Sequence, residues 1–326
     1  HLGYADPSLL PINRGFKQTV TMPFSGGDNW TQQSYVPHYD KTLWLENGKE
    51  ISVPEGFYSS KFIVDKAIQQ LDNNQKTHEG KRKPFFSYVS FQAVHIPLQA
   101  PEEFTEKYIG SYREGWHALR KNRQNAVKDL GLIPASVPMK RMATTDDWDN
   151  LSEEKKRYND KRMAVYAGMV DAMDYHIGRL IQYLKESGQY DNTVIIFTSD
   201  NGPAASDVPL LWIKALGYNR DYETLGERYS YGTIGASFGS AVASPFAHYK
   251  FHSSEGGIRA PLIISGPQVA DSHRGRISHS RAFINDLAPT ILALAGTRHP
   301  GTKYKGKAIE ATTGKNLLPV IAAKTD

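Results

Sequence analysis

The sequence predicts an α/β sandwich with a largely parallel central sheet. Three short apolar segments have the length and composition of buried strands, namely 85–91 (FFSYVSF), 193–200 (TVIIFTSD) and 260–266 (APLIISG). A long segment with apolar residues at helical spacing separates the first two. Strands that alternate with long helices are typical of a parallel sheet with helices packed on its faces.

We expect the clearest helix of the chain over residues 163–184. Its apolar positions recur at helical spacing: Met163, Tyr166, Val170, Met173, Ile177, Leu180, Ile181 and Leu184. Gly188 is expected to end this helix. A second helix should carry Ile291, Leu292 and Leu294 toward Gly296. The segment 112–150 is expected to be an insert that is helical around 114–130, whereas 203–248 has no clean strand or helix pattern.

Composition indicates a globular protein and excludes several chemistries. The chain has 326 residues, of which 40% are hydrophobic, 11% aromatic and 22% charged. No apolar run approaches the length of a membrane span. The net charge of +5 suits anionic substrates but does not indicate nucleic-acid binding. Cysteine is absent, which excludes disulfides, thiolate metal sites and a cysteine nucleophile within this chain and leaves the compartment open.

The end of the 193–200 strand combines a carboxylate with a carboxamide. Asp200 and Asn201 stand directly before Gly202 and Pro203. Ligands of open α/β sheets bind beyond the carboxyl ends of strands, and oxygen donors suit calcium or magnesium. The alternative is an Asx-type turn, in which one side chain bonds its own backbone. On this stretch alone, the turn is the favoured interpretation.

Two further segments offer groups that could act on an anion. His95 lies four residues beyond the 85–91 strand, in apolar surroundings that should keep its imidazole neutral near pH 7. A lone histidine there can equally be a structural hydrogen-bonding group. Lys250 precedes the 260–266 strand on a loop that also holds His252, Glu255 and a Gly-Gly pair. Such a lysine is either solvated or binds an anion as a point charge.

Six segments, in order and with matching spacing, carry a family resemblance. They are HLG (1–3), RGF (14–16), FQAVHIPLQAPEEF (91–104), VYAGMVDAMDYHIGRLIQYLKESGQYDNTVIIFTSDNG (165–202), YKFHSSEGGIRAPLIISG (249–266) and INDLAPTILALAG (284–296). The chain resembles the sulfatases of the alkaline phosphatase superfamily, and it looks most like bacterial arylsulfatases. The resemblance implies an alkaline-phosphatase-like α/β/α sandwich, with residues 1–326 forming a single, partial sulfatase-type domain.

The resemblance also implies roles for matching residues. Asp200 and Asn201 would be ligands of a catalytic calcium ion, with magnesium as the alternative metal. His95 would protonate the departing alcohol, Lys250 would hold the sulfate oxygens, and His1 would bond to the nucleophile. The implied partner is a small-molecule sulfate ester, most plausibly an aryl sulfate, with neither nucleic acid nor membrane involved. Fixed cations and a proton donor aimed at those oxygens lower the barrier of sulfuryl transfer.

The sequence departs from the family pattern at the nucleophile. Sulfatases use a formylglycine made from the first residue of a Cys/Ser-x-Pro-x-Arg motif, and this chain has no cysteine and no Ser-x-Pro-x-Arg. The family's adjacent pair of aspartate metal ligands would also precede His1. We therefore expect a chain that is incomplete at the N-terminus, lacks the small C-terminal sheet domain, holds calcium weakly or not at all, and is inactive by itself. Its unpaired sheet edge should pack against another chain or against its own segments.

Some functional alternatives stay open from the sequence. The rivals are a phosphonate or phosphodiester hydrolase of the same superfamily and a noncatalytic binding module with the same fold. The segment 203–248 is rich in aromatic residues: Trp212, Tyr218, Tyr222, Tyr229, Tyr231, Phe238 and Phe246. These rings could line a pocket for an aromatic leaving group or could anchor the segment to the body of the protein.

Overall fold

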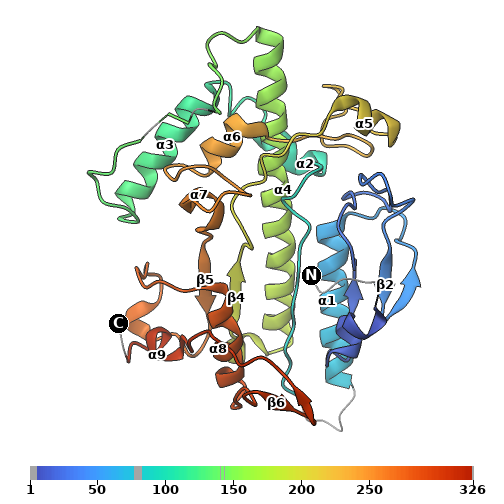
Figure 1. Ribbon diagram of the computed structural model, residues 1–326, viewed down its shortest axis with the longest axis vertical. Helices are drawn as coiled ribbons and strands as arrows, with labels where there is room; N and C mark the ends of the chain where they lie inside the picture. Colours follow the sequence, from blue (N-terminus) through green and yellow to red (C-terminus); the bar gives the residue numbers. More distant parts are fainter. Residues whose placement is uncertain (1–5, 77–82, 140, 143, 325–326) are drawn as a thin grey trace.

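A computed structural model describes residues 6–76, 83–139, 141–142 and 144–324 (Figure 1). The helices are α1 (Ser59–Lys76), α2 (Glu102–Thr105), α3 (Gly115–Asp129), α4 (Glu153–Glu186), α5 (Leu210–Ala215), α6 (Gly235–Val242), α7 (Glu255–Ile258), α8 (Leu287–Leu294) and α9 (Leu318–Ile321). The strands are β1 (Val20–Thr21), β2 (Trp44–Glu46), β3 (Lys49–Ile51), β4 (Ile195–Thr198), β5 (Leu262–Ser265), β6 (Lys303–Tyr304) and β7 (Lys307–Ala308). Short 3-10 helices cover Pro7–Leu9, Pro11–Asn13, Glu106–Tyr108, Tyr190–Asn192, Asp271–His273 and Ile284–Asp286.

Helix α4 forms the long axis of the molecule and lies at its centre in Figure 1. The Ser152 side chain caps its N-terminus by accepting a hydrogen bond from the backbone N–H of Lys155 at 3.3 Å. The helix ends just before Gly188, which adopts a φ of 65°. The helix expected over 163–184 is therefore confirmed, and it begins ten residues earlier because the charged first turns are also helical.

Two of the buried apolar clusters of the described residues pack around this axis. In the first, the small antiparallel sheet β1-β2-β3 covers α1, with Trp44, Phe57 and Phe62 buried between them. In the second, α3 and α6 pack beside the N-terminal half of α4 around the buried rings of Trp116 and Phe238. Figure 1 shows these cores at opposite sides of α4, with α3 and α6 at the upper left and the β1-β2-β3 sheet at the right.

Two other helix predictions have clear outcomes. The helices expected around 114–130 and toward Gly296 are present as α3 and α8. The segment 203–248, expected to be irregular, contains the helices α5 and α6. Helix α6 has the sequence GASFGSAV, which has low intrinsic helix propensity, and its burial against α3 and α4 outweighs that propensity.

Two of the predicted strands are present, but the predicted parallel direction of their pairing is not found. Strands β4 and β5 occur where the apolar segments 193–200 and 260–266 predicted strands. They pair antiparallel, with Ile195 opposite Ser265 and Thr198 opposite Leu262. All strand pairs within the described residues are antiparallel, so the largely parallel sheet expected from the sequence is not found there. Apolar periodicity identifies a strand, but it carries no information on the direction of its partner.

The segment 85–91 was expected to be a buried strand, and this prediction is wrong. It has no assigned strand structure, and Phe86 and Tyr88 are exposed by 56% and 75%. The ring of Phe86 lies 5.8 Å from that of Phe16, which covers only part of it. A β-prone sequence forms a strand only with a hydrogen-bonding partner, and no described strand lies beside this segment.

None of the described helices combines the length and the apolar character needed to cross a bilayer.

Candidate active site

The turn after β4 carries Asp200 and Asn201 at the end of a strand, as the sequence predicted. Asp200 is exposed, and the side-chain amide of Asn201 donates to the carbonyl of Gly202 at 2.8 Å. The Ser199 hydroxyl donates to the carbonyl of Asn201 at 3.0 Å. These bonds form the local turn that was the alternative interpretation, yet they leave the Asp200 carboxylate and the Asn201 side-chain oxygen available to a ligand.

Backbone contacts hold this turn against the Lys250 loop. The N–H of Gly202 donates to the carbonyl of Gly257 at 2.8 Å, and the N–H of Lys250 donates to the carbonyl of Pro203 at 3.1 Å. A Cβ on residue 202 would collide with the carbonyl of Gly256, so only glycine fits here. The Asp-Asn-Gly turn and the Gly-Gly pair, separate in the sequence, are therefore two sides of one close backbone contact.

His95 is half-buried, and its orientation is set by its own backbone. Its Nδ1 lies 3.0 Å from the carbonyl of Ile96 and 3.3 Å from the hydroxyl of Tyr35. A carbonyl oxygen only accepts, so we assign the ring proton to Nδ1. The neutral imidazole then carries no proton on Nε2. His95 can donate a proton from Nε2 only in its doubly protonated form.

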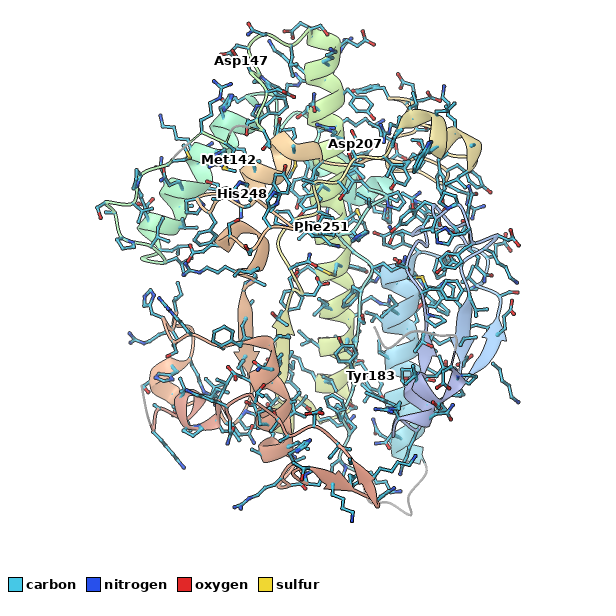
Figure 2. The ribbon with its side chains drawn as sticks, in the orientation of Figure 1. Met142, Asp147, Tyr183, Asp207, His248 and Phe251 are labelled. Carbon is cyan, nitrogen blue, oxygen red and sulfur yellow. The ribbon has the colours of Figure 1, made fainter. Side chains whose placement is uncertain are left out.

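The pKa of His95 connects three of the predicted residues. Burial lowers this pKa, the contact with the Ile96 carbonyl raises it, Lys250 lowers it and Asp200 raises it. The sequence-based expectation of a neutral imidazole is borne out in direction. Because Lys250 and Asp200 both influence His95, the three groups share one electrostatic environment. The Nζ of Lys250 is 5.4 Å from the centroid of the Phe251 ring. Figure 2 labels Phe251 and His248, which belong to the same loop.

Tyr35 is a site residue that the sequence did not reveal. Burial raises the pKa of its hydroxyl to about 12, so the group stays protonated at neutral pH. Its ring packs edge-on against Tyr231, with centroids 5.7 Å apart. Tyr35 precedes His95 by 60 residues and belongs to none of the recognised segments, so no local signal could have identified it.

The described residues do not complete a metal site. They contain no group of three or more His, Cys, Asp or Glu side chains placed to hold an ion. Asp200 and Asn201 offer two side-chain ligands with at most three oxygens between them, whereas calcium takes about six to eight oxygen ligands. The oxygen chemistry suits calcium, but two donors do not form a calcium site. His1, expected to contact the nucleophile, lies outside the described residues.

The aromatic residues of 203–248 divide between the two roles considered for them. Tyr218, Tyr231 and Phe238 are buried and anchor the segment to the body of the protein. Trp212, Tyr222 and Tyr229 are exposed and remain free to meet a ligand. The anchoring interpretation therefore holds for the three buried rings, and a pocket lined by the exposed rings stays a prediction.

Comparisons with known proteins identify the family. A model of the sulfatase family, described as "Sulfatase", matches residues 4–297. The chain belongs to the sulfatase family. This sulfatase chain is 38% identical over 330 residues to an uncharacterized sulfatase of Schizosaccharomyces pombe, with 97% of the chain and 58% of the relative covered. It is 30% identical over 335 residues to an arylsulfatase of Klebsiella aerogenes, with 99% and 69% covered.

A solved structure supports the fold. The crystal structure of Ps i-CgsB in complex with k-i-k-neocarrahexaose superposes with a TM-score of 0.57 at 23% identity, over 98% of this chain and 53% of that one. The fold of the sulfatase chain is thus the alkaline-phosphatase-like α/β fold. The chain spans little more than half the length of the yeast relative and of this solved chain.

Proposed function

We propose that the protein containing this chain hydrolyses sulfate esters of phenols at the site around His95, Lys250 and Asp200. One observation carries the proposal: the backbone N–H of Lys250 donates to the carbonyl of Pro203 at 3.1 Å, which holds the Lys250 loop against the turn that carries Asp200. The charges of Lys250 and Asp200 both act on His95 and shift its pKa in opposite directions. This arrangement supports a site in which His95 would serve as proton donor, Lys250 as the cation for an anionic ester and Asp200 as a carboxylate ligand. Membership of the sulfatase family supports sulfate esters as the substrate class, and the arylsulfatase relative supports a phenolic leaving group.

In this proposal Lys250 binds the sulfate oxygens and His95 protonates the leaving oxygen from Nε2. Burial and the charge of Lys250 both lower the pKa of His95 in the free site. A sulfate ester bound to Lys250 would offset that charge and raise the pKa, so substrate binding would itself favour the protonated, donating imidazole. The exposed Trp212, Tyr222 and Tyr229 are candidates to contact the phenol.

Two components of the proposed reaction need groups beyond those described. Asp200 and Asn201 would contribute oxygens to a divalent cation, calcium or alternatively magnesium, which would supply positive charge next to the sulfate. The nucleophile would be a formylglycine, for which this chain has neither a cysteine nor a Ser-x-Pro-x-Arg motif.

The first prediction tests His95 in a longer protein that joins this chain to a sulfatase nucleophile motif. His95→Ala should slow a sulfate ester with a poor leaving group by about 10²–10⁴-fold and should slow a nitrophenyl sulfate far less. A good leaving group departs without a proton, so it loses little. Values of kcat/KM for both esters provide the measurement.

His252→Ala is the matched control for this experiment, because His252 is an exposed histidine two residues after Lys250. It should leave both rates nearly unchanged. Equal slowing of the two esters by His95→Ala would exclude His95 as the general acid. Faster turnover of a phosphate diester than of the sulfate would favour the phosphodiesterase alternative, and turnover of neither would favour a binding module.

The second prediction concerns the 326-residue chain alone. It should show no turnover of an aryl sulfate above buffer, because it has no residue from which a formylglycine could form at a family motif. Loss of a catalytic nucleophile typically removes most of the rate acceleration. The assay should use protein whose intact mass has been confirmed. Turnover that disappears in His95→Ala would show that another residue supplies the nucleophile.

A further inference from the structure

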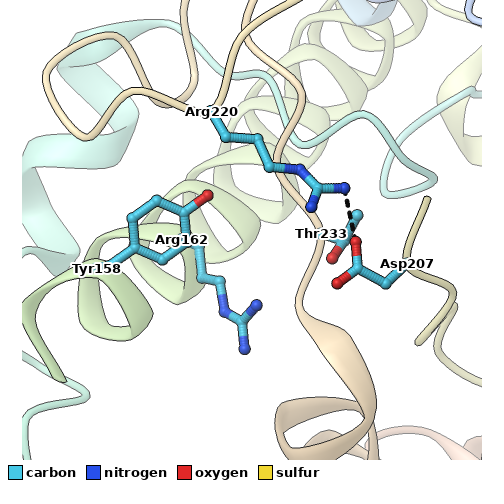
Figure 3. A pocket seen from close by; sticks show the side chains of 5 residues that line it. All are labelled: Tyr158, Arg162, Asp207, Arg220 and Thr233. Carbon is cyan, nitrogen blue, oxygen red and sulfur yellow. Dashed lines mark hydrogen bonds and ion pairs between the residues drawn. The ribbon is translucent and has the colours of Figure 1, made fainter. Parts of the chain in front are cut away.

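A second polar cavity lies away from the His95 site, beside the N-terminal half of α4. Its volume is about 290 Å³, and it is lined by Tyr158, Arg162, Asp207, Arg220 and Thr233 (Figure 3). Tyr158 and Arg162 are four residues apart on α4, which puts both side chains on one face of the helix. A cavity of this size is near the lower end of the range for small-ligand sites.

Arg162 has no partner in this cavity. Its Nε is enclosed and makes no hydrogen bond, and no hydrogen bond or ion pair joins its guanidinium to any described residue. Figure 3 shows the guanidinium across the cavity from Arg220 and Asp207, with no dashed line reaching it. Burial lowers the pKa of Arg162, because moving a cation out of water carries a cost, although only its Nε is fully enclosed and the residue as a whole is half-buried. Unpaired guanidinium groups in such settings are rare because that cost is not offset.

The other charges of the cavity do not neutralise Arg162. Arg220 donates to the Asp207 carboxylate at 2.6 Å and to the carbonyl of Val208 at 2.5 Å. The carboxylate is therefore already engaged, and it is the only carboxylate among the residues that line the cavity. The charge of Asp146, an exposed residue outside the lining, also acts on Arg162 but makes no ion pair with it. The Nε of Arg220 is also enclosed without a partner.

The backbone next to Arg162 adds to the positive character. A Cβ on Gly235 would lie 3.1 Å from an Nη atom of Arg162, so the guanidinium lies against this glycine. Gly235 is the first residue of α6, and no side chain caps that helix. The N-terminal end of a helix carries partial positive charge, so an anion in the cavity beside both groups would be attracted by the guanidinium and by the helix end.

We propose that this cavity is a binding site for an oxyanion, such as sulfate or a sulfate group on a larger molecule, held by Arg162 and Arg220 with the hydroxyls of Tyr158 and Thr233. The planar fork of a guanidinium binds two oxygens of such a group at once. The site is separate from the proposed catalytic site and does not depend on catalysis. Two rings stand between them: the Arg220 guanidinium lies 5.9 Å from the Tyr231 ring, which packs against Tyr35, and Tyr35 contacts His95.

The test is the effect of sodium sulfate on the melting temperature of the 326-residue chain, with sodium chloride adjusted to constant ionic strength. Saturating sulfate should raise the melting temperature by at least about 2 °C. Arg162→Gln should abolish this shift and weaken sulfate binding at least about tenfold in calorimetry. Arg162→Lys keeps the positive charge but loses the planar guanidinium that binds two oxygens at once. This variant should retain part of the sulfate-dependent rise in melting temperature.

Two control variants separate this site from other cations. Arg274→Gln removes an exposed arginine that also pairs with an aspartate, Asp271, and should keep the sulfate-dependent shift. Lys250→Gln removes the cation of the proposed catalytic site and should also keep the sulfate-dependent rise in melting temperature. Phenyl sulfate should be tested on Lys250→Gln with and without the additional Arg162→Gln substitution. Binding that is lost only when Arg162 is also replaced would assign the site to a sulfate group on a larger molecule. Binding of inorganic sulfate alone would assign it to the free ion.

The free protein supplies a second readout. Without sulfate, Arg162→Met should melt at the same or a higher temperature than the wild type, because it removes an unpaired, enclosed cation. A lower melting temperature for Arg162→Met, with a sulfate shift retained in Arg162→Gln, would overturn the proposal. An absent sulfate effect in the wild type, or an equal effect of chloride, would overturn it as well.

Discussion

At the scale of single residues, burial has the same effect on two histidines with different surroundings. It lowers the pKa of both His95 and His176, and a neighbouring cation lowers it further in each case. For His95 that cation is Lys250, which a bound anion can neutralise. For His176 it is Arg179, whose Nη1 lies 3.2 Å from the ring Nδ1 and whose Nη2 is paired with Asp65. Only the first arrangement makes the protonation state depend on a ligand.

The buried His176 should make the stability of the chain depend on pH. Its pKa in the folded protein is about 4, below the value of about 6.5 expected for an unfolded chain. Between these values the unfolded state binds more protons, so the free energy of unfolding should fall as pH falls from about 6.5 toward 4, by on the order of 1–3 kcal/mol. Urea unfolding at a series of pH values measures this.

The matching variant is His176→Phe, which removes the titrating ring while filling a similar volume. The difference in pH dependence between wild type and variant isolates His176 from the other acidic groups. Identical slopes of unfolding free energy against pH for the two proteins would mean that His176 titrates normally.

At the scale of elements, the site depends on how closely two loops approach each other. The turn after β4 and the start of α7 are in backbone contact through Gly202 and Gly257, and Lys250 is bonded to the same turn through Pro203. A rigid contact of this kind keeps Asp200 and Lys250 at a constant separation although both lie on loops. The strand and the short helix act mainly as supports for this contact.

Gly202→Ala should therefore destabilise the chain by about 1–3 kcal/mol, because its Cβ would meet the Gly256 carbonyl and force the loops apart. Gly178→Ala is the control. Gly178 lies within α4 with open space around its Cα, so alanine there should stabilise by about 0.5–1 kcal/mol. Chemical denaturation of the two variants beside the wild type provides the comparison. An unchanged free energy of unfolding in Gly202→Ala would mean that the turn after β4 and the start of α7 can move apart without cost.

At the scale of the whole molecule, several large apolar side chains on separate segments stay exposed. Among the exposed apolar side chains are Phe86 and Tyr88 of the unpaired segment 85–91, Ile263 of β5, and Phe283 and Ile284 before α8. Extended segments with free backbone groups and exposed rings tend to recruit another chain.

The 326-residue chain should accordingly self-associate in solution. Light scattering coupled to size exclusion should give a mass above that of a monomer and rising with concentration. The double substitution Phe86→Ser and Tyr88→Ser should lower this mass. Leu211→Ser, which removes an equally exposed side chain on α5, should not. A monomeric mass at all concentrations would mean that the exposed segment 85–91 does not cause self-association.

Much of the candidate site could be located from the sequence, because its residues follow recognisable segments. Asp200 and Asn201 end an apolar strand, His95 lies in a matching family segment, and Lys250 precedes another strand. The roles implied for these residues remain proposals. Tyr35 could not be found, since it contacts His95 only through the fold. Arg162 lies just before the helix expected over 163–184, and nothing in the local sequence distinguishes it from a solvated arginine.

The sequence by itself determined the features that depend on neighbouring residues: the long helix α4 and its end near Gly188, the positions of β4 and β5, and membership of the sulfatase family. Only the tertiary structure decided that β4 and β5 pair antiparallel, that the segment 85–91 has no partner, that the GASFGSAV segment is helical, and that Arg162 faces Arg220 and Asp207. The physical reason is the range of the interactions. Backbone preference and apolar periodicity act within a few turns of chain, whereas strand pairing, burial and the balance of charge in a cavity depend on which distant residues the fold brings together.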